Sequence, residues 1–171
     1  MVRQAWGRVL LLHDAVTRMG FAASAIILAL IAISFSYEVV ARYFFGAPTS
    51  WANAFVAYFL CASIFLAAPE LTRRRAHVAV TILSDRASPG FRAALHRVVL
   101  AAGAGACLLA TWITANATAD QFAMGIDTIS AYPIPKWLVS IFIPYGMLSS
   151  SLYFLRDLTG GDLGANSGPT P

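Results

Sequence analysis

The stretch RYFFGAPTSWANAFVAYFLCASIFLAAPELTRRRAH, residues 42–77, decides the fold, because it holds one apolar run between two different kinds of end. Aromatic residues and a Gly-Ala-Pro turn precede the run, and three consecutive arginines follow it. In membrane proteins, aromatic side chains favour the headgroup region, and short arginine-rich loops stay on the cytoplasmic side. The stretch therefore predicts a membrane-spanning helix whose second end contacts lipid at the cytoplasmic interface through Arg73, Arg74, Arg75 and His77.

The composition extends this prediction to the whole chain. Its 171 residues are 58% hydrophobic and 12% charged, whereas about a quarter of the residues in soluble domains are charged. Four apolar runs approach the roughly 20 residues that cross a hydrocarbon core as a helix, and they lack the alternation of a membrane β-barrel. We therefore expect an all-α membrane protein, with one domain of residues 1–158 and four transmembrane helices at about 19–41, 51–68, 98–119 and 137–155.

The distribution of basic residues predicts the orientation. Arginines precede the first run and follow the second, whereas the other two connections have one basic residue each, Arg42 and Lys136. Loops rich in Lys and Arg stay inside, so both termini are expected in the cytoplasm. On that side we expect short interfacial helical segments at 5–18 and 77–83 and a disordered tail at 159–171. The first residues lack the unbroken apolar core of a signal peptide, so we expect them to be retained.

Proline and glycine refine the helices. The pair Ser88-Pro89 is typical of an N-cap followed by a first-turn proline, so the third helix is expected to begin in the cytoplasm and project beyond the lipid. Pro144 lies inside the fourth run, where its missing N–H predicts a kink near residues 141–144. Small residues of the third run, among them Gly103 and Gly105, allow another helix to approach closely. That helix belongs either to this chain or to a second subunit.

Glu38 is the one acidic or basic residue inside a long apolar run, and intramembrane charges commonly mark functional sites. Arg42 lies four residues later on the same helix face. Two interpretations stay open, an ion pair that anchors the helix end or a contact with a substrate, a proton or a partner. The neighbouring aromatic residues are typical of interface anchoring, and docking of an external protein is the alternative, with the candidates Arg42, Tyr43, Trp51 and Asn53.

The chain carries no pattern for catalysis or cofactor binding. Cys61 and Cys107 lie in apolar runs without a CxxC spacing, which is typical of small buried side chains rather than of a metal site or disulfide. All three histidines lie outside the runs, so the paired haem ligands of a membrane cytochrome are missing. The arginines lie beside apolar runs and not on a soluble face, so nucleic-acid binding is not expected. We expect no cofactor, no metal and no enzymatic activity.

The ordered set of motifs resembles the small membrane subunit, DctQ-like, of tripartite ATP-independent periplasmic (TRAP) transporters. The resemblance covers nearly all four runs. Family members usually carry acidic residues where this chain has Asn53 and Ala54, and often an aspartate where it has Thr81. The motifs are RYFF at 42–45, SWA at 50–52, RRRAHV at 73–78, PKWL at 135–138, and Pro144 with Gly146.

The resemblance implies a sodium-driven, high-affinity importer of organic acids in the bacterial inner membrane. It implies three parts, namely a periplasmic substrate-binding protein, a large membrane subunit of about twelve spans that holds the substrate and sodium sites, and this small subunit. The small subunit would act as a scaffold for the static part of the large one and would help the binding protein to dock.

Two other classes stay as alternatives. One is a small homodimeric, proton-coupled exporter with Glu38 as the coupling site, which is disfavoured because Glu38 lies at a helix end beside Arg42. The other is a membrane anchor for a redox enzyme, which is disfavoured by the lack of histidines in the runs.

Overall fold

The computed structural model describes residues 2–47, 49, 51–74, 89–129 and 133–159. Within them the chain is helical, and four of its stretches are long and apolar enough to span a membrane: Leu10–Phe45, Ala54–Arg73, Ala94–Met124 and Lys136–Leu158. The expected all-α membrane fold with four transmembrane helices is confirmed. The helices are α1 (Val2–Phe45), α2 (Ala52–Arg73), α4 (Pro89–Met124), α5 (Lys136–Ser140) and α6 (Phe142–Leu158).

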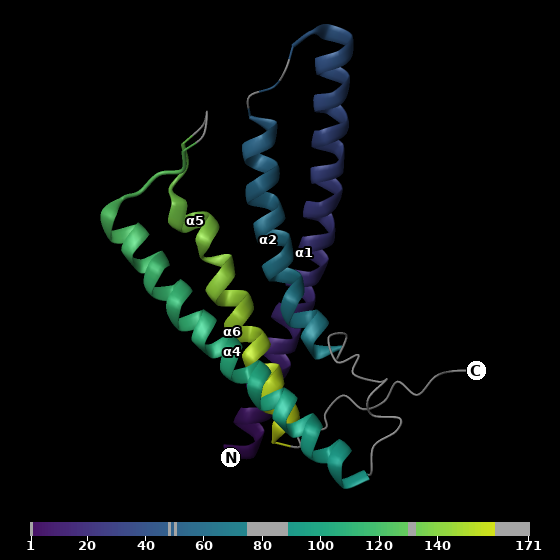
Figure 1. The fold of residues 1–171 in the computed structure, drawn as a ribbon, viewed down its shortest axis with the longest axis vertical. Coiled ribbons are helices and arrows are strands. Elements are labelled where there is room, and N and C mark those ends of the chain that lie inside the picture. Colours follow the sequence, from purple (N-terminus) through teal and green to yellow (C-terminus); the bar gives the residue numbers. More distant parts are fainter. Residues whose placement is uncertain (1, 48, 50, 75–88, 130–132, 160–171) are drawn as a thin grey trace, which may run out of the picture.

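The helices form an open row (Figure 1). α1 packs against α2, α2 against α6, and α6 against α4, so α1 and α4 are the outer members of the row. The hairpins α1–α2 and α4–α6 meet at the end where α1 begins and α6 ends, which we call the network end. They diverge towards the end with the connections 46–51 and 125–135, which we call the loop end.

The centre of the row depends on a very close approach between α2 and α6. A Cβ atom on Gly146 would overlap the carbonyl oxygen of Phe65, so only glycine fits there. Pro69 lies four residues after Phe65 inside α2 and has no N–H to bond that oxygen. The proline thus removes a helix hydrogen bond where α6 comes closest, a place where Cα–H contacts to a carbonyl oxygen are common. Other small residues that are buried along α6 are Ser149, Ser150 and Ser151.

The two glycines of the third span have different surroundings. A Cβ atom on Gly103 would lie 3.3 Å from the ring of Phe154 on α6, which is a tight contact between two helices of this chain. A Cβ atom on Gly105 would meet no atom within 4 Å among the described residues. Gly103 therefore packs within the chain, and Gly105 lies on an open face of α4.

Proline accounts for the interruption of the fourth span. α5 ends at Ser140 and α6 begins at Phe142, so the break falls at Ile141, within the stretch predicted to kink. Pro144 has no N–H to offer the carbonyl of residue 140, four positions earlier. The prediction of a kink before Pro144 is confirmed.

Several helices are longer than the apolar runs predicted. α4 begins at Pro89 as expected but continues to Met124, and α2 continues past residue 68 to Arg73. The stretch 5–18, expected as an interfacial helical segment leading into the first span, is helical and is continuous with that span as the first part of α1. The expected segment at 77–83 and the tail beyond residue 159 lie outside the described residues.

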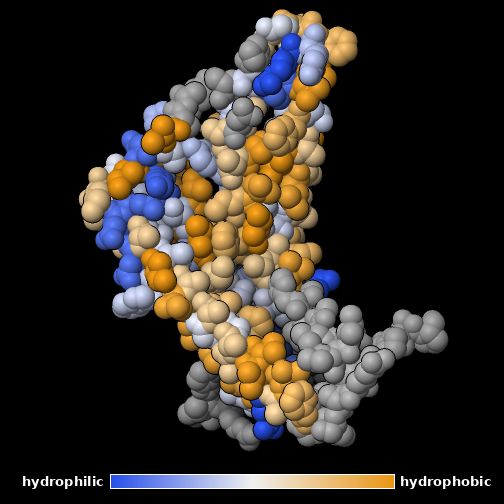
Figure 2. All heavy atoms as spheres, viewed as in Figure 1, coloured by the Kyte–Doolittle hydropathy of each residue, from blue (hydrophilic) through white to orange (hydrophobic). Residues whose placement is uncertain are grey.

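Most of the surface between the two ends is apolar. Figure 2 shows hydrophobic residues over much of the visible face of the row. Within the most apolar window of each span, 6% of the residues are buried in α1 and 11% in α4, against 28% in α2 and 28% in the fourth span. The outer helices therefore present most of their side chains to lipid or to another protein.

Candidate functional site

At the loop end, Glu38 closes the connection between α1 and α2. Its Oε1 accepts a hydrogen bond from Arg42 Nη2 at 2.6 Å, and its Oε2 accepts one from the Thr49 backbone N–H at 3.0 Å. The Glu38 side chain is 5% exposed, whereas that of Arg42 is 52% exposed. Both carboxylate oxygens are engaged inside the hairpin, so the geometry supports the structural interpretation of Glu38.

The residues predicted as docking candidates at this end differ in their exposure and in their contacts. Tyr43 is 80% exposed, and the side chain of the neighbouring Arg42 is 52% exposed. Trp51 stacks on Tyr37 of α1 with ring centroids 6.3 Å apart, so it helps to hold α1 and α2 together. The side chain of Asn53 lies outside the described part of the chain.

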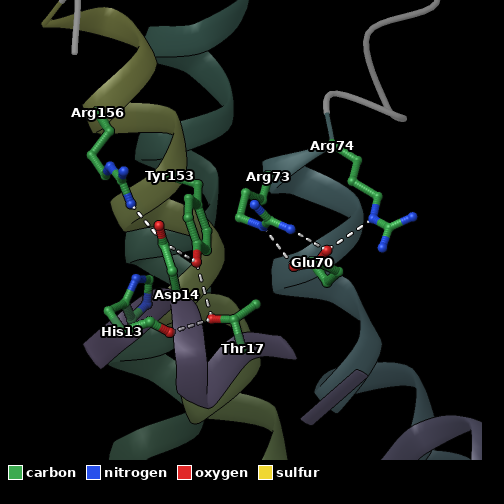
Figure 3. A network of polar contacts seen from close by, with 8 residues as sticks. All are labelled: His13, Asp14, Thr17, Glu70, Arg73, Arg74, Tyr153 and Arg156. Carbon is green, nitrogen blue, oxygen red and sulfur yellow. Dashed lines mark hydrogen bonds and ion pairs between the residues drawn. The ribbon is translucent and has the colours of Figure 1, made fainter. Parts of the chain in front are cut away.

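At the network end, a carboxylate joins the first helix to the last (Figure 3). Asp14 Oδ1 on α1 accepts hydrogen bonds from Arg156 Nη1 and from the Tyr153 hydroxyl of α6, both at 2.8 Å. The Tyr153 hydroxyl also lies 3.1 Å from Thr17 Oγ1, which itself donates to the carbonyl of His13 at 2.9 Å. Side chains from α1 and α6 thus share one polar cluster.

His13 adds a second link between the same helices. Its Nε2 lies 2.8 Å from Ser149 Oγ, and its ring centroid lies 4.7 Å from that of Tyr153. The linked residues are 136 to 142 positions apart in the sequence. Because α1 neighbours α2 rather than α6 along the row, these contacts tie one hairpin to the other at the network end.

At the end of α2, beside this cluster, Glu70 is buried against two arginines (Figure 3). Arg73 Nε donates to Glu70 Oε2 at 2.7 Å, and Arg74 Nε donates to Oε1 at 2.8 Å. The Glu70 side chain is 1% exposed. A buried carboxylate in the last turn of a helix is unfavourable for both desolvation and the helix dipole, and the two guanidinium groups offset these costs.

Helix lengths place these charges near a membrane surface. At about 1.5 Å per residue, α2 extends about 35 Å from Trp51 to Arg74, and α1 extends about 45 Å from Phe45 back to Asp14. The hydrocarbon core is about 30 Å thick. With the loop end at one surface, both charged groups reach the headgroups of the other.

Glu70 and Asp14 were not among the site residues predicted from the sequence. Glu70 has a signal, because Arg73 and Arg74 follow at the three- and four-residue spacings that favour ion pairs on a helix. Asp14 has none, since its partner Arg156 is 142 positions away. Of the predicted cytoplasmic cluster, Arg75 and His77 lie outside the described residues. Within those residues, no group of three His, Cys, Asp or Glu is placed to hold a metal ion.

The fold is that of a multi-pass membrane protein with four membrane helices. Among the described residues, its charged pairs lie at the two ends of the row, near the two membrane surfaces. Residues 31–162 match the family described as "Tripartite ATP-independent periplasmic transporters, DctQ component". The chain belongs to this family, as its motifs indicated. The match includes Glu38, Glu70 and Arg156 and begins after Asp14. No curated protein matches the chain.

Proposed function

We propose that this chain is the non-catalytic small permease subunit of a sodium-driven, binding-protein-dependent importer of organic acids in the inner membrane, with both termini in the cytoplasm. Its family makes it a component of a tripartite transporter. The observation that carries the proposal is the open row, in which only 6% of the residues in the most apolar window of α1 and 11% of those in that of α4 are buried. Such a row suits a scaffold that covers part of a larger membrane protein.

One face of α4 supports this role. Gly105, Leu109 and Trp112 follow one another at spacings of four and three residues, so they share a helix face. Leu109 is 61% exposed and Trp112 is 70% exposed, whereas the space beside Gly105 is open among the described residues. A small residue beside large apolar ones lets a second helix approach closely, which is a main source of helix association in lipid. We propose this face as a contact with the large membrane subunit.

The loop end supports the docking part of the proposal. With the cytoplasm at the network end, the exposed Tyr43 and Arg42 face the periplasm, where a binding protein would approach. Beside them, Glu38 accepts a hydrogen bond from the Thr49 backbone N–H, which links the end of α1 to the residues before α2.

The decisive experiment is reconstitution of the transporter in liposomes. We expect uptake of a labelled carboxylic acid, chosen from a panel, only when the large subunit, this chain and the binding protein are all present with an inward sodium gradient. Transport by this chain alone would show that the proposal is wrong. Uptake by the large subunit and binding protein without this chain, at an undiminished rate, would equally contradict the scaffold role.

Two variants locate the surfaces. Gly105→Leu is expected to lower co-purification of the large subunit about tenfold while leaving the melting temperature of the isolated chain unchanged. Tyr43→Ala is expected to weaken binding of the binding protein about fivefold without affecting that co-purification. Arg97→Gln, at an exposed position of α4 near the network end, is the control for both and is expected to change neither.

A further inference from the structure

At the end of α2, Arg74 is bound to Glu70 although Arg73 already neutralises that carboxylate. Glu70 already receives two hydrogen bonds from Arg73, through Nε to Oε2 and through Nη2 to Oε1. Arg74 adds a third through its Nε, so one carboxylate faces two guanidinium groups. The group of three residues therefore carries a net charge of +1, and its excess positive charge lies on the more exposed arginine.

Two contacts fix Arg74 in place. Its Nε is bound to Glu70 Oε1 at 2.8 Å, and its guanidinium carbon lies 5.2 Å from the ring centroid of Phe21 on α1. Its side chain is still 60% exposed, and Figure 3 shows its terminal nitrogens directed away from Glu70. A planar guanidinium held in one orientation, with its outer N–H groups free of Glu70, is suited to bind a phosphate.

The depth of Arg74 and its apolar surroundings favour a lipid as the source of that phosphate. Arg74 lies about 35 Å along α2 from Trp51, which is the distance from one headgroup layer to the other across about 30 Å of hydrocarbon. On α1, Ala25 and Leu28 lie four and seven residues after Phe21 on the same helix face. Ala25 is exposed and Leu28 is 50% exposed, so an apolar track leads from the guanidinium into the bilayer.

We propose that Arg74, oriented by Glu70 and Phe21, binds the headgroup phosphate of an anionic phospholipid whose acyl chain lies along Ala25 and Leu28. The site joins α1 and α2 from outside, at the point where Phe21 meets the end of α2. It requires only that the chain spans a membrane and does not depend on the proposed transport role.

The test is a lipid titration of the purified full chain in detergent, followed by native mass spectrometry with phosphatidylglycerol as the probe. Arg74→Gln is expected to weaken phosphatidylglycerol binding about fivefold or more, as for the loss of one arginine at an anionic surface. Arg97→Gln removes the same charge from an exposed position on α4, and is expected to change binding less than about twofold. Equal effects of the two variants, or no effect of either, would overturn the proposal.

Three further arms distinguish the lipid site from a soluble-anion site and from a protein contact. Phe21→Leu keeps the apolar contact but removes the ring under the guanidinium, so it is expected to weaken binding about two- to threefold, even if Arg74→Gln fails to fold. Sodium phosphate is expected to displace no more lipid than sodium chloride of the same ionic strength. Greater displacement by phosphate would identify a soluble anion as the ligand. If Arg74→Gln abolished co-purification of the large subunit and left phosphatidylglycerol binding intact, Arg74 would be a protein contact and the lipid site would be refuted.

Discussion

The two ends of the helix row are held together in different ways. At the loop end, the contacts of Glu38 with Arg42 and Thr49 stay within one hairpin, and the hairpins diverge. At the network end, Asp14 bonds two side chains of the opposite hairpin. Side-chain hydrogen bonds thus join the two hairpins at the network end. Changes there are expected to alter the whole row, whereas a change at Glu38 is expected to alter one connection.

The largest expected effect comes from the close approach that places α6 on α2. Gly146→Val forces a side chain against the backbone of Phe65, which cannot move away as a flexible side chain would. We expect a loss of about 3 kcal/mol or more in the free energy of unfolding, measured by denaturant titration in micelles. The matched control is Gly105→Val, which introduces the same side chain where nothing lies within 4 Å among the described residues. Equal losses for the two variants would refute the close approach.

The second largest effect is expected from a change that breaks the hydrogen bonds between the hairpins. Asp14→Asn leaves the guanidinium of Arg156, whose side chain is 20% exposed, without its carboxylate. We expect a loss of about 2 kcal/mol in the free energy of unfolding. A broader distribution of distances between spin labels placed at positions 44 and 126, on the two hairpins, is also expected. The exposed Asp120 provides the control, since Asp120→Asn should leave both measurements unchanged. If the distribution of label distances stayed narrow in Asp14→Asn, the network would not set the angle between the hairpins.

Removal of one hydroxyl from the same network is expected to have a smaller effect. Tyr153→Phe keeps the ring beside His13 but loses the O–H that bonds Asp14 and lies near Thr17. The expected loss is about 1 kcal/mol, measured by the same unfolding titration. Tyr43→Phe removes an identical hydroxyl from a side chain that is 80% exposed, and it should leave the free energy of unfolding unchanged. A loss in Tyr153→Phe no larger than in Tyr43→Phe would argue against the hydroxyl as a link.

The smallest effect is expected at the loop end. Glu38→Gln keeps an acceptor for the Thr49 N–H and loses only the charge opposite Arg42, whose side chain is 52% exposed. The expected loss is about 0.5 kcal/mol. Hydrogen exchange of the Thr49 amide should stay slow in Glu38→Gln and become fast in Glu38→Ala. If both variants exchanged equally fast, the ion pair rather than the backbone bond would hold the connection.

Local features of the fold were predictable because their causes lie within a few residues. Pro144 interrupts the fourth span at Ile141, and Pro89 begins α4, because a missing N–H acts on its own helix. The pair Glu38 and Arg42 follows from the four-residue spacing of a helix. The length of α2 was underestimated because Pro69 and Glu70 resemble an end of the apolar run, whereas burial of Glu70 against Arg73 allows the helix to continue.

The candidate surfaces were only partly predictable. The sequence indicated Tyr43 and Trp51 as one aromatic cluster, but the structure separates them, since Trp51 packs on Tyr37 and Tyr43 is exposed. Exposure depends on which helix lies beside a residue, and an aromatic residue near a membrane interface is compatible with either outcome. For the same reason, the sequence indicated close packing for Gly103 and Gly105 alike. Gly103 packs against Phe154, whereas a Cβ atom on Gly105 would meet nothing within 4 Å among the described residues.

The four apolar helices, their approximate limits and the family were predictable from the amino-acid sequence, because hydropathy, proline and charge act locally along the chain. Tertiary structure alone decided the order α1, α2, α6, α4, the contact of Gly146 with Phe65, and the bonds of Asp14 to Tyr153 and Arg156. Lipid surrounds every apolar face equally well, so hydropathy does not choose between neighbours. Close backbone contact and the pairing of polar groups make that choice, and both join residues far apart in the sequence.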